Sequence, residues 1–147
     1  MKKKISAIAC SFFIIATLTG MNNDRLNKVH QTQPDIQKSI LEGKKVFSKY
    51  CISCHQADGG GVPYLNPPLI KTSYVLGNKD SLIHIILHGL NRNIEIEDEV
   101  FTNPMPALNI LKDEEIANVL TYVRNSFGNK ASAVMPAEVK AMRSKMK

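Results

Sequence analysis

Cys51, Cys54 and His55 lie in the segment CISCH, where two thiols are separated by two residues and followed directly by an imidazole. C-x-x-C-H is the attachment signal for a c-type haem. On one turn of chain, each thiol can add to one vinyl group of the porphyrin. The histidine then presents its imidazole to the iron from one side. The motif occurs once in the sequence, which predicts a single covalently attached haem.

Two other interpretations of these cysteines are weaker. A thioredoxin-like redox motif requires a βαβ context, whereas here a predicted helix precedes the motif and a glycine-rich loop follows it. In a zinc site, His84 and His88 would complete the ligand set of the cysteines. That site would place 29 residues between Cys54 and His84, far from the usual spacing of about 12 to 15. It would also leave His55 without a role.

Met105 is the predicted iron ligand on the opposite side from His55. It lies in NPMPAL between two prolines, and Pro106 biases it towards an extended backbone. Prolines have no N–H to donate, so this stretch is expected to form a rigid loop rather than a regularly hydrogen-bonded β-strand. A methionine is usually core filler, but a rigid loop presenting a thioether is what a sixth iron ligand requires. A histidine ligand or an open site is the alternative.

The 23 residues after His55 are predicted to be a loop, because they contain three successive glycines and three prolines. The glycines prevent regular structure and let the backbone approach a flat ligand. Several apolar residues of this loop are expected to pack against an apolar surface. That surface could be a face of the porphyrin, and the alternative is the ordinary protein core. These residues are Val62, Leu65, Leu69 and Ile70.

Three main helices are expected to hold these residues in place. The first begins near Pro34, with Asp35 at the positive end of the helix dipole. Its apolar face has steps of four and three residues, typical of a helix: Ile36, Ile40, Gly43, Phe47 and Tyr50. A glycine in a helix costs about 1 kcal/mol relative to alanine, so Gly43 indicates that another helix crosses closely.

The other two helices are predicted over residues 81–88 and 113–126. Asp80 is expected to cap the first of them, and Gly89 to end it. The last helix carries the apolar stripe that should face the first helix: Ile116, Val119, Leu120, Val123 and Phe127. Residues 94–101 predict a hairpin with an acidic tip. Residues 129–147 predict a tail with a short helix on the surface.

Residues 1–20 resemble an export signal. Three lysines precede an apolar run of 14 residues, Ile5 to Leu18, shorter than the roughly 20 residues needed to span a bilayer. The cleavage site is poor, so an uncleaved membrane anchor is the alternative. Cys10 is a weak lipoprotein signal, because the apolar run continues past it. Residues 21–34 are a polar linker. We therefore expect an exported, periplasmic protein.

Composition limits the remaining possibilities. The chain has 147 residues and a formal net charge of +6. Lysines 2 to 4 supply three of the 19 basic residues, so without the first 20 residues the charge falls to +3. That is too little to indicate nucleic-acid binding. The sequence has no Trp and only 6% aromatic residues. Its core must be filled by aliphatic side chains or by something other than an amino acid.

From about Ile36 to Gly128, the sequence resembles the class I c-type cytochromes. The resemblance rests on CISCH, NPPL, NPMPAL and DEEIANVLTYVRNSFGN. It implies an all-α fold, with three main helices around one covalent haem, over residues 35–128.

The resemblance also implies roles for individual residues. Cys51 and Cys54 would bind the haem, His55 would be the proximal ligand and Met105 the distal one. The carbonyl of Pro67 would accept a hydrogen bond from the histidine, and Leu69 would contact the haem. The helix-crossing residues would be Gly43, Phe47 and Tyr122. Lys112 departs from the Ser or Thr that many relatives place before the last helix, which affects only the helix cap.

The implied function is one-electron transfer, without enzymatic activity. Two strong iron ligands leave no vacant position for a substrate. The expected partners are redox proteins, with a dehydrogenase or respiratory complex as donor and an oxidase or reductase as acceptor. A membrane is a partner only if residues 1–20 stay attached. The alternatives are a dedicated haem subunit of a dehydrogenase, or a small haem peroxidase or gas-binding protein.

Overall fold

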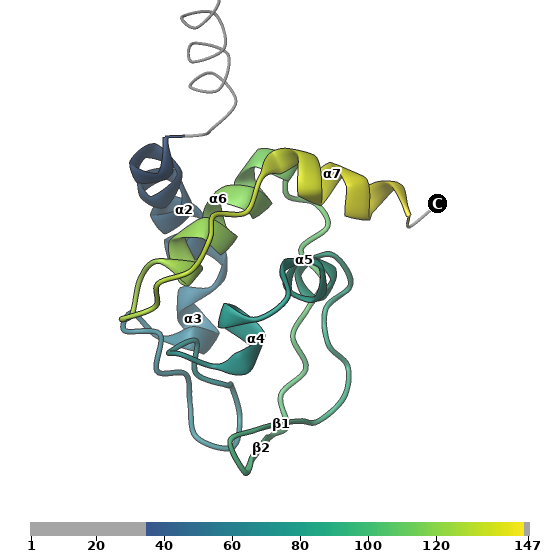
Figure 1. The fold of residues 1–147 in the computed structure, drawn as a ribbon. Helices are drawn as coiled ribbons and strands as arrows, with labels where there is room; N and C mark the ends of the chain where they lie inside the picture. Colours follow the sequence, from purple (N-terminus) through teal and green to yellow (C-terminus); the bar gives the residue numbers. More distant parts are fainter. Residues whose placement is uncertain (1–34, 146–147) are drawn as a thin grey trace, which may run out of the picture. The chain divides into compact units, whose positions relative to one another are not determined.

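The computed structural model describes residues 35–145, so the predicted export signal and the polar linker lie outside the described residues. Within the described range, six helices and a two-stranded antiparallel sheet follow one another along the chain (Figure 1). In order, they are α2 (Ile36–Tyr50), α3 (Ile52–His55), α4 (Ser73–Leu76), α5 (Lys79–His88), β1 (Ile94–Ile96), β2 (Glu99–Phe101), α6 (Asp113–Arg124) and α7 (Pro136–Ser144). The predicted mainly helical fold is confirmed. None of the described helices has the length and apolar character needed to cross a bilayer.

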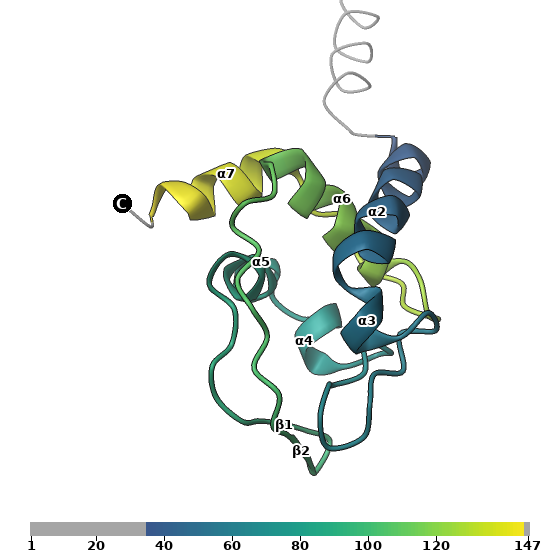
Figure 2. The ribbon, with the colours of Figure 1, turned by 180° about the vertical axis from the view of Figure 1, so that it is seen from behind.

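Helices α2 and α6 cross, as the glycine on the first helix predicts, and both ribbon views show them together (Figures 1 and 2). A Cβ added to Gly43 would overlap the carbonyl of Asn118 and the side chain of Tyr122. Any larger residue at position 43 would therefore push the helices apart. Beside the crossing, the rings of Phe47, Tyr122 and Phe127 pack with centroids 5.4 to 5.6 Å apart.

The helix starts follow the expected capping chemistry, with one correction. Asp35 caps α2, because its carboxylate accepts hydrogen bonds from the backbone N–H groups of residues 37 and 38. The predicted cap at Asp80 is wrong. Asn78 caps α5 by accepting from the N–H groups of residues 80 and 81, and Asp80 lies in the first turn. At α6, the backbone N–H of Lys112 donates to Glu115 at 2.8 Å.

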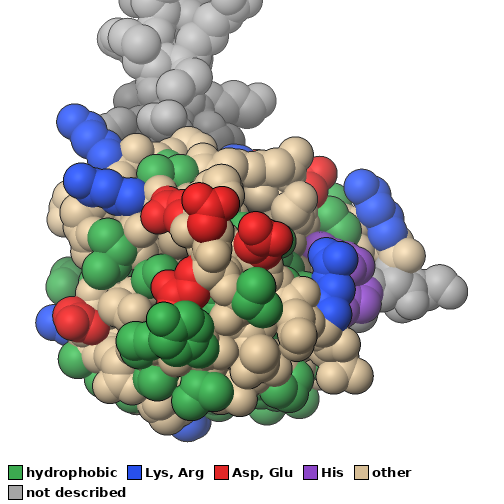
Figure 3. All heavy atoms as spheres, turned by 90° about the horizontal axis from the view of Figure 1, so that it is seen from below, with side chains coloured by type: hydrophobic (Ala, Val, Ile, Leu, Met, Phe, Trp, Pro, Cys, Tyr) green, Lys and Arg blue, Asp and Glu red, His purple; other side chains and the backbone are tan. Residues whose placement is uncertain are grey.

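The predicted hairpin is present and ends in an acidic turn. Ile94 pairs with Phe101 and Ile96 with Glu99, which leaves Glu97 and Asp98 as a two-residue loop. Both loop residues have positive φ, 53° and 66°, as the favoured two-residue hairpin turns require. Seen from below, this end of the molecule carries acidic side chains next to hydrophobic ones (Figure 3).

The C-terminal segment packs more deeply than the predicted surface tail. Val134 and Val139 are buried in the core, and α7 packs against α6 and α5. The buried guanidinium of Arg124 donates to the carbonyls of Val75 and Ser132 at 2.6 and 2.9 Å. Asn129 donates to the carbonyls of residues 69 and 123 and accepts from the N–H of residue 71. These bonds fasten the segment before α4 to the end of α6.

Candidate functional site: an apolar cavity between the motif and the methionine loop

The described structure brings all six predicted site residues to two adjoining hollows at the centre of the fold. The first has about 660 Å³ of space between its lining atoms, part of it open to solvent. Both hollows are lined by Cys51, His55, Pro67 and Met105. Leu69 lines the first hollow, and Cys54 lines only the second.

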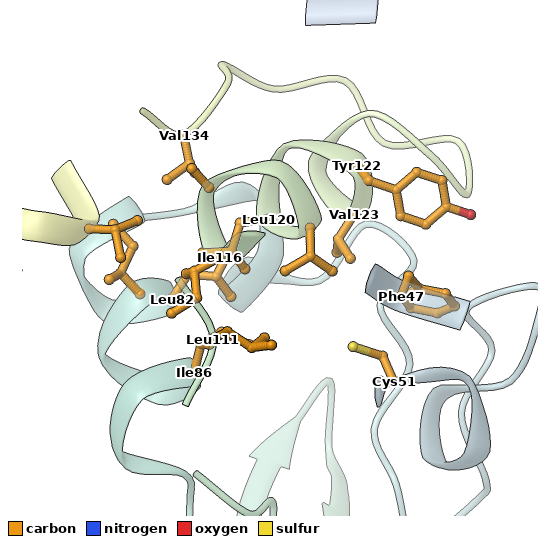
Figure 4. Close-up of a cluster of buried hydrophobic side chains, with 14 of the residues drawn as sticks. Phe47, Cys51, Leu82, Ile86, Leu111, Ile116, Leu120, Tyr122, Val123 and Val134 are labelled. Carbon is orange, nitrogen blue, oxygen red and sulfur yellow. The ribbon is translucent and has the colours of Figure 1, made fainter. Parts of the chain in front are cut away.

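The walls of this cavity are almost entirely aliphatic and aromatic. One wall is the inner face of α5, and another is α6 (Figure 4). Figure 4 shows the sulfur of Cys51 pointing into the space between them. The principal residues that line these walls are Leu82, Ile85, Ile86, Val119, Leu120 and Val123. The hairpin adds Ile94 and Ile96. Their only sequence signal is their apolar spacing, which ordinary core residues share.

The two cysteines differ in their surroundings, although both belong to the same turn. Cys51 ends α2 and is buried, whereas Cys54 is exposed within α3. Burial raises the pKa of the Cys51 thiol to about 11, and the nearby Cys54 adds to the rise. Cys51 therefore faces the core and Cys54 the rim, as expected for two anchors of one flat group that enters from the edge.

His55 is held in one orientation by the loop that follows it. Its Nδ1 lies 3.0 Å from the carbonyl oxygen of Pro67. Because a carbonyl can only accept, Nδ1 carries the proton and Nε2 keeps a free lone pair for a metal. Burial lowers the pKa of His55, against the opposing effect of this hydrogen bond. The imidazole is therefore favoured in the neutral form that iron ligation needs.

The glycine-rich loop acts differently from the prediction. A Cβ on Gly61 would overlap the backbone of Asn66 and Pro67, so the missing side chain lets protein backbone, rather than a flat ligand, approach. Val62, Leu65 and Ile70 do not line the cavity, and the last two are exposed. Only Leu69 of the four predicted covering residues lines it. Apolar character in a loop did not reveal which side chains turn inwards.

Met105 is fixed by paired backbone hydrogen bonds. Its N–H donates to the carbonyl of Leu90 and its carbonyl accepts from the N–H of Leu90, both at 2.9 Å. Gly89 precedes this bridge with φ of 73°, and a Cβ there would overlap the carbonyl of Met105 and the N–H of Ala107. The methionine loop thus rests directly on the end of α5.

Gly89→Ala is expected to loosen Met105 without removing it. The alanine would meet both the unfavourable positive φ and the overlap with the methionine loop. We expect the variant holoprotein to bind imidazole at least tenfold more tightly than the parent, because the thioether is more easily displaced. Absorbance titration of the ferric form measures this. Gly128→Ala is the control, since its φ is also positive but its Cβ would meet only the end of the Lys71 side chain. Equal imidazole affinity in both variants would contradict the expectation.

The zinc alternative has no support in residues 35–145. No three His, Cys, Asp or Glu side chains there are grouped to hold a metal ion. His84 and His88 are exposed and stack on one another with ring centroids 3.9 Å apart.

A covalently anchored haem fits this cavity. Two thiols lie at one side, a neutral imidazole and a thioether reach the same space, and the walls are apolar. These features fit the class of proteins that hold a haem covalently, with a nitrogen and a sulfur donor available to its iron.

Comparison with known proteins also points to a haem protein. A family model described as Cytochrome c matches residues 40–127. Cytochrome c-552 of Thermus thermophilus is 34% identical over 113 residues, covering 71% of this chain and 86% of the relative. Cytochrome c6 of Thermostichus vulcanus is 30% identical, covering 84% and 91%. The cytochrome c subunit of a quinone alcohol dehydrogenase from Gluconacetobacter polyoxogenes is 36% identical over 101 residues, which is 66% of this chain but 21% of that longer subunit.

The chain belongs to the cytochrome c family. It binds one covalent c-type haem and is an electron-transfer protein rather than an enzyme.

Proposed function

We propose that this protein is an exported one-electron carrier that moves electrons between a dehydrogenase or respiratory complex and a terminal acceptor. The observation that carries the proposal is the convergence of the CISCH turn and the methionine loop on one apolar cavity. When bound, the haem supplies the Fe(III)/Fe(II) couple.

Each site residue has a distinct task in this proposal. Cys51 and Cys54 anchor the haem covalently, so the carrier keeps it outside the cytoplasm. His55, held by the Pro67 carbonyl, ligates one side of the iron through Nε2. Met105 ligates the other side, and a thioether ligand favours the reduced state and raises the potential. Leu69 and the other apolar lining residues disfavour the extra positive charge of the oxidised state.

Redox-resolved absorption spectra of the purified holoprotein test this function. We expect a low-spin, six-coordinate spectrum in both oxidation states, reversible reduction, and the thioether-haem signature after conversion to the pyridine complex. A weak near-infrared sulfur-to-iron band should be present in the ferric form only. A high-spin, five-coordinate resting spectrum would contradict the assignment of Met105 as the sixth iron ligand. It would also contradict a function limited to electron transfer.

A dedicated subunit of a dehydrogenase is the second candidate. It is favoured by the similarity to longer proteins described as cytochrome subunits of alcohol and fructose dehydrogenases. Size-exclusion chromatography of native extract separates the two candidates. A free carrier elutes as a small monomer, near or below the 16.3 kDa of the full polypeptide, whereas a permanent subunit elutes with a large dehydrogenase.

The proposed location depends on residues 1–20. If these residues are a cleaved signal, the mature protein should be recovered in the soluble periplasmic fraction, with an N-terminus beyond Leu18. Cell fractionation followed by N-terminal sequencing measures both properties. Protein that begins at Met1 and stays with the membrane would instead identify an anchored cytochrome. A version without residues 1–20 is the control, and it should accumulate in the cytoplasm without haem.

A further inference from the structure

His84 and His88 form a pair of exposed histidines on α5, and neither lines the haem cavity. They are four residues apart, so their side chains are neighbours on one face of the helix. Their rings stack with centroids 3.9 Å apart and an angle of 27° between the planes. Figure 3 shows histidine side chains together at the molecular surface, beside basic ones. The haem site makes no use of this pair.

The hydrogen bond of His88 leaves one of its nitrogens free for a metal ion. Its Nδ1 lies 3.0 Å from the carbonyl oxygen of His84. A carbonyl can only accept, so Nδ1 carries the proton and Nε2 keeps its lone pair. Histidines that bind metals almost always donate their other N–H to such an acceptor, as His55 does to Pro67. The same bond holds the ring of His88 against the helix.

The ring of His84 has no hydrogen bond or ion pair with another residue of the described range. One ion beside the stacked rings can therefore take a nitrogen from each of them. Two histidines at this spacing on a helix also bind zinc in the H-E-x-x-H motif of metalloproteases. In that motif a glutamate after the first histidine is the general base. Here Ile85 has that position, so the pair is suited to binding an ion and not to hydrolysis.

The charges beside the pair are balanced. An outer hollow on this side of α5 is lined, among others, by His84, Asp80, Arg92 and Met142. Asp80 lies one helical turn before His84, and its carboxylate offsets the positive charge of Arg92 in the same hollow. Within residues 35–145, no group of three His, Cys, Asp or Glu side chains could hold a metal ion. Water molecules therefore fill the remaining positions around an ion held by the pair.

We propose that His84 and His88 together bind one divalent first-row transition-metal ion of the class of Zn²⁺ and Cu²⁺. Imidazole nitrogen suits both ions. The site differs from the zinc site rejected above, because it needs neither cysteine of the haem motif. A bound ion joins the two ends of the last turn of α5, which is followed by Gly89, the residue on which the Met105 loop rests. Metal binding thus stiffens the support of the methionine loop.

Isothermal titration calorimetry of the holoprotein with Zn²⁺ tests the assignment, since Zn²⁺ has no redox chemistry of its own. The parent should bind one ion at the pair. His84→Gln and His88→Gln should each weaken binding by about tenfold or more, because a single imidazole is left. His30→Gln is the matched control: it also removes one histidine, but from the predicted linker. It should bind Zn²⁺ as the parent does.

Hydrogen exchange of the holoprotein locates the ion independently. The N–H of Gly89 donates to the carbonyl of Ile85 at 2.7 Å, and its exchange should slow when Zn²⁺ is added to the parent but not to His88→Gln. An affinity that is unchanged in either variant of the pair, or lost in His30→Gln, overturns the proposal. Exchange at Gly89 that Zn²⁺ does not slow in the parent also overturns it, because the ion would then lie away from this turn.

Discussion

Replacing Cys51 or Cys54 with alanine is expected to give little stable holoprotein and an apoprotein that is mostly unfolded. Without the haem, the aliphatic core side chains that line the cavity lose the group they pack against. An unfilled cavity costs about 24 cal/mol per Å³. The net stability of a folded protein is usually only about 5 to 15 kcal/mol, so an unfilled cavity in the core removes a large share of it. The sequence has no Trp to fill the gap.

Far-UV circular dichroism and haem-stained gels of exported protein measure this loss. Ser53→Ala is the matched control, because Ser53 lies between the two cysteines and is exposed. It should keep the haem and the helical signal of the parent. Cys51→Ala should be the more damaging of the two cysteine changes, since Cys51 is buried in the core cluster whereas Cys54 is exposed. A soluble apo domain with a normal helical spectrum would refute the idea that the haem completes the core.

Features governed by neighbouring residues were predictable from sequence. The CISCH turn is local, so its chemistry follows from spacing alone. The crossing of α2 and α6 followed from one glycine on an apolar face, and the structure places Gly43 against Asn118. The cap of α5 was misplaced by two residues because Asn78 and Asp80 are both good caps. Only the path of the preceding chain decides between them.

Features governed by distant contacts were not predictable. The sequence indicated a surface helix at the C-terminus, but the helix is fixed by partners far away in the chain. Arg143 pairs with Asp113 at 2.8 Å, and Lys79 pairs with Glu138. The same holds for the cavity wall, where Ile94 and Ile96 line the cavity from a hairpin nearly 40 residues beyond the haem motif. Their inward direction depends on the register of two short strands, which is not a local property.

The position of the methionine loop depends both on neighbouring residues and on distant contacts. Two prolines around Met105 are visible in the sequence and predict a rigid, extended presentation. The bridge to Leu90 and the close approach of Gly89 appear only in the structure. Together they hold the thioether beside the cavity from two directions. A ligand held in this way should keep its place in both oxidation states, which rapid electron exchange requires.

Met105→His is therefore expected to lower the midpoint potential by at least ~0.1 V, within the roughly 0.8 V over which axial ligands tune haem iron. A thioether is a soft donor that favours Fe(II), whereas imidazole is a more basic nitrogen that favours Fe(III). The variant should also lose the near-infrared sulfur-to-iron band of the ferric form. Spectroelectrochemical titration records both properties on one sample.

Met105→Ala should instead open the iron to cyanide or imidazole, because Met105 is the only methionine within residues 35–145 that lines the cavity. Met142→Ala is the matched control: Met142 is also partly buried against the core, but it lines the outer hollow beside His84 rather than the haem cavity. It should leave the potential, the near-infrared band and ligand binding as in the parent. If Met105→Ala kept both the potential and the band, another residue would be the sixth ligand. The paired prolines would then have to be explained by the packing of the loop on α5 alone.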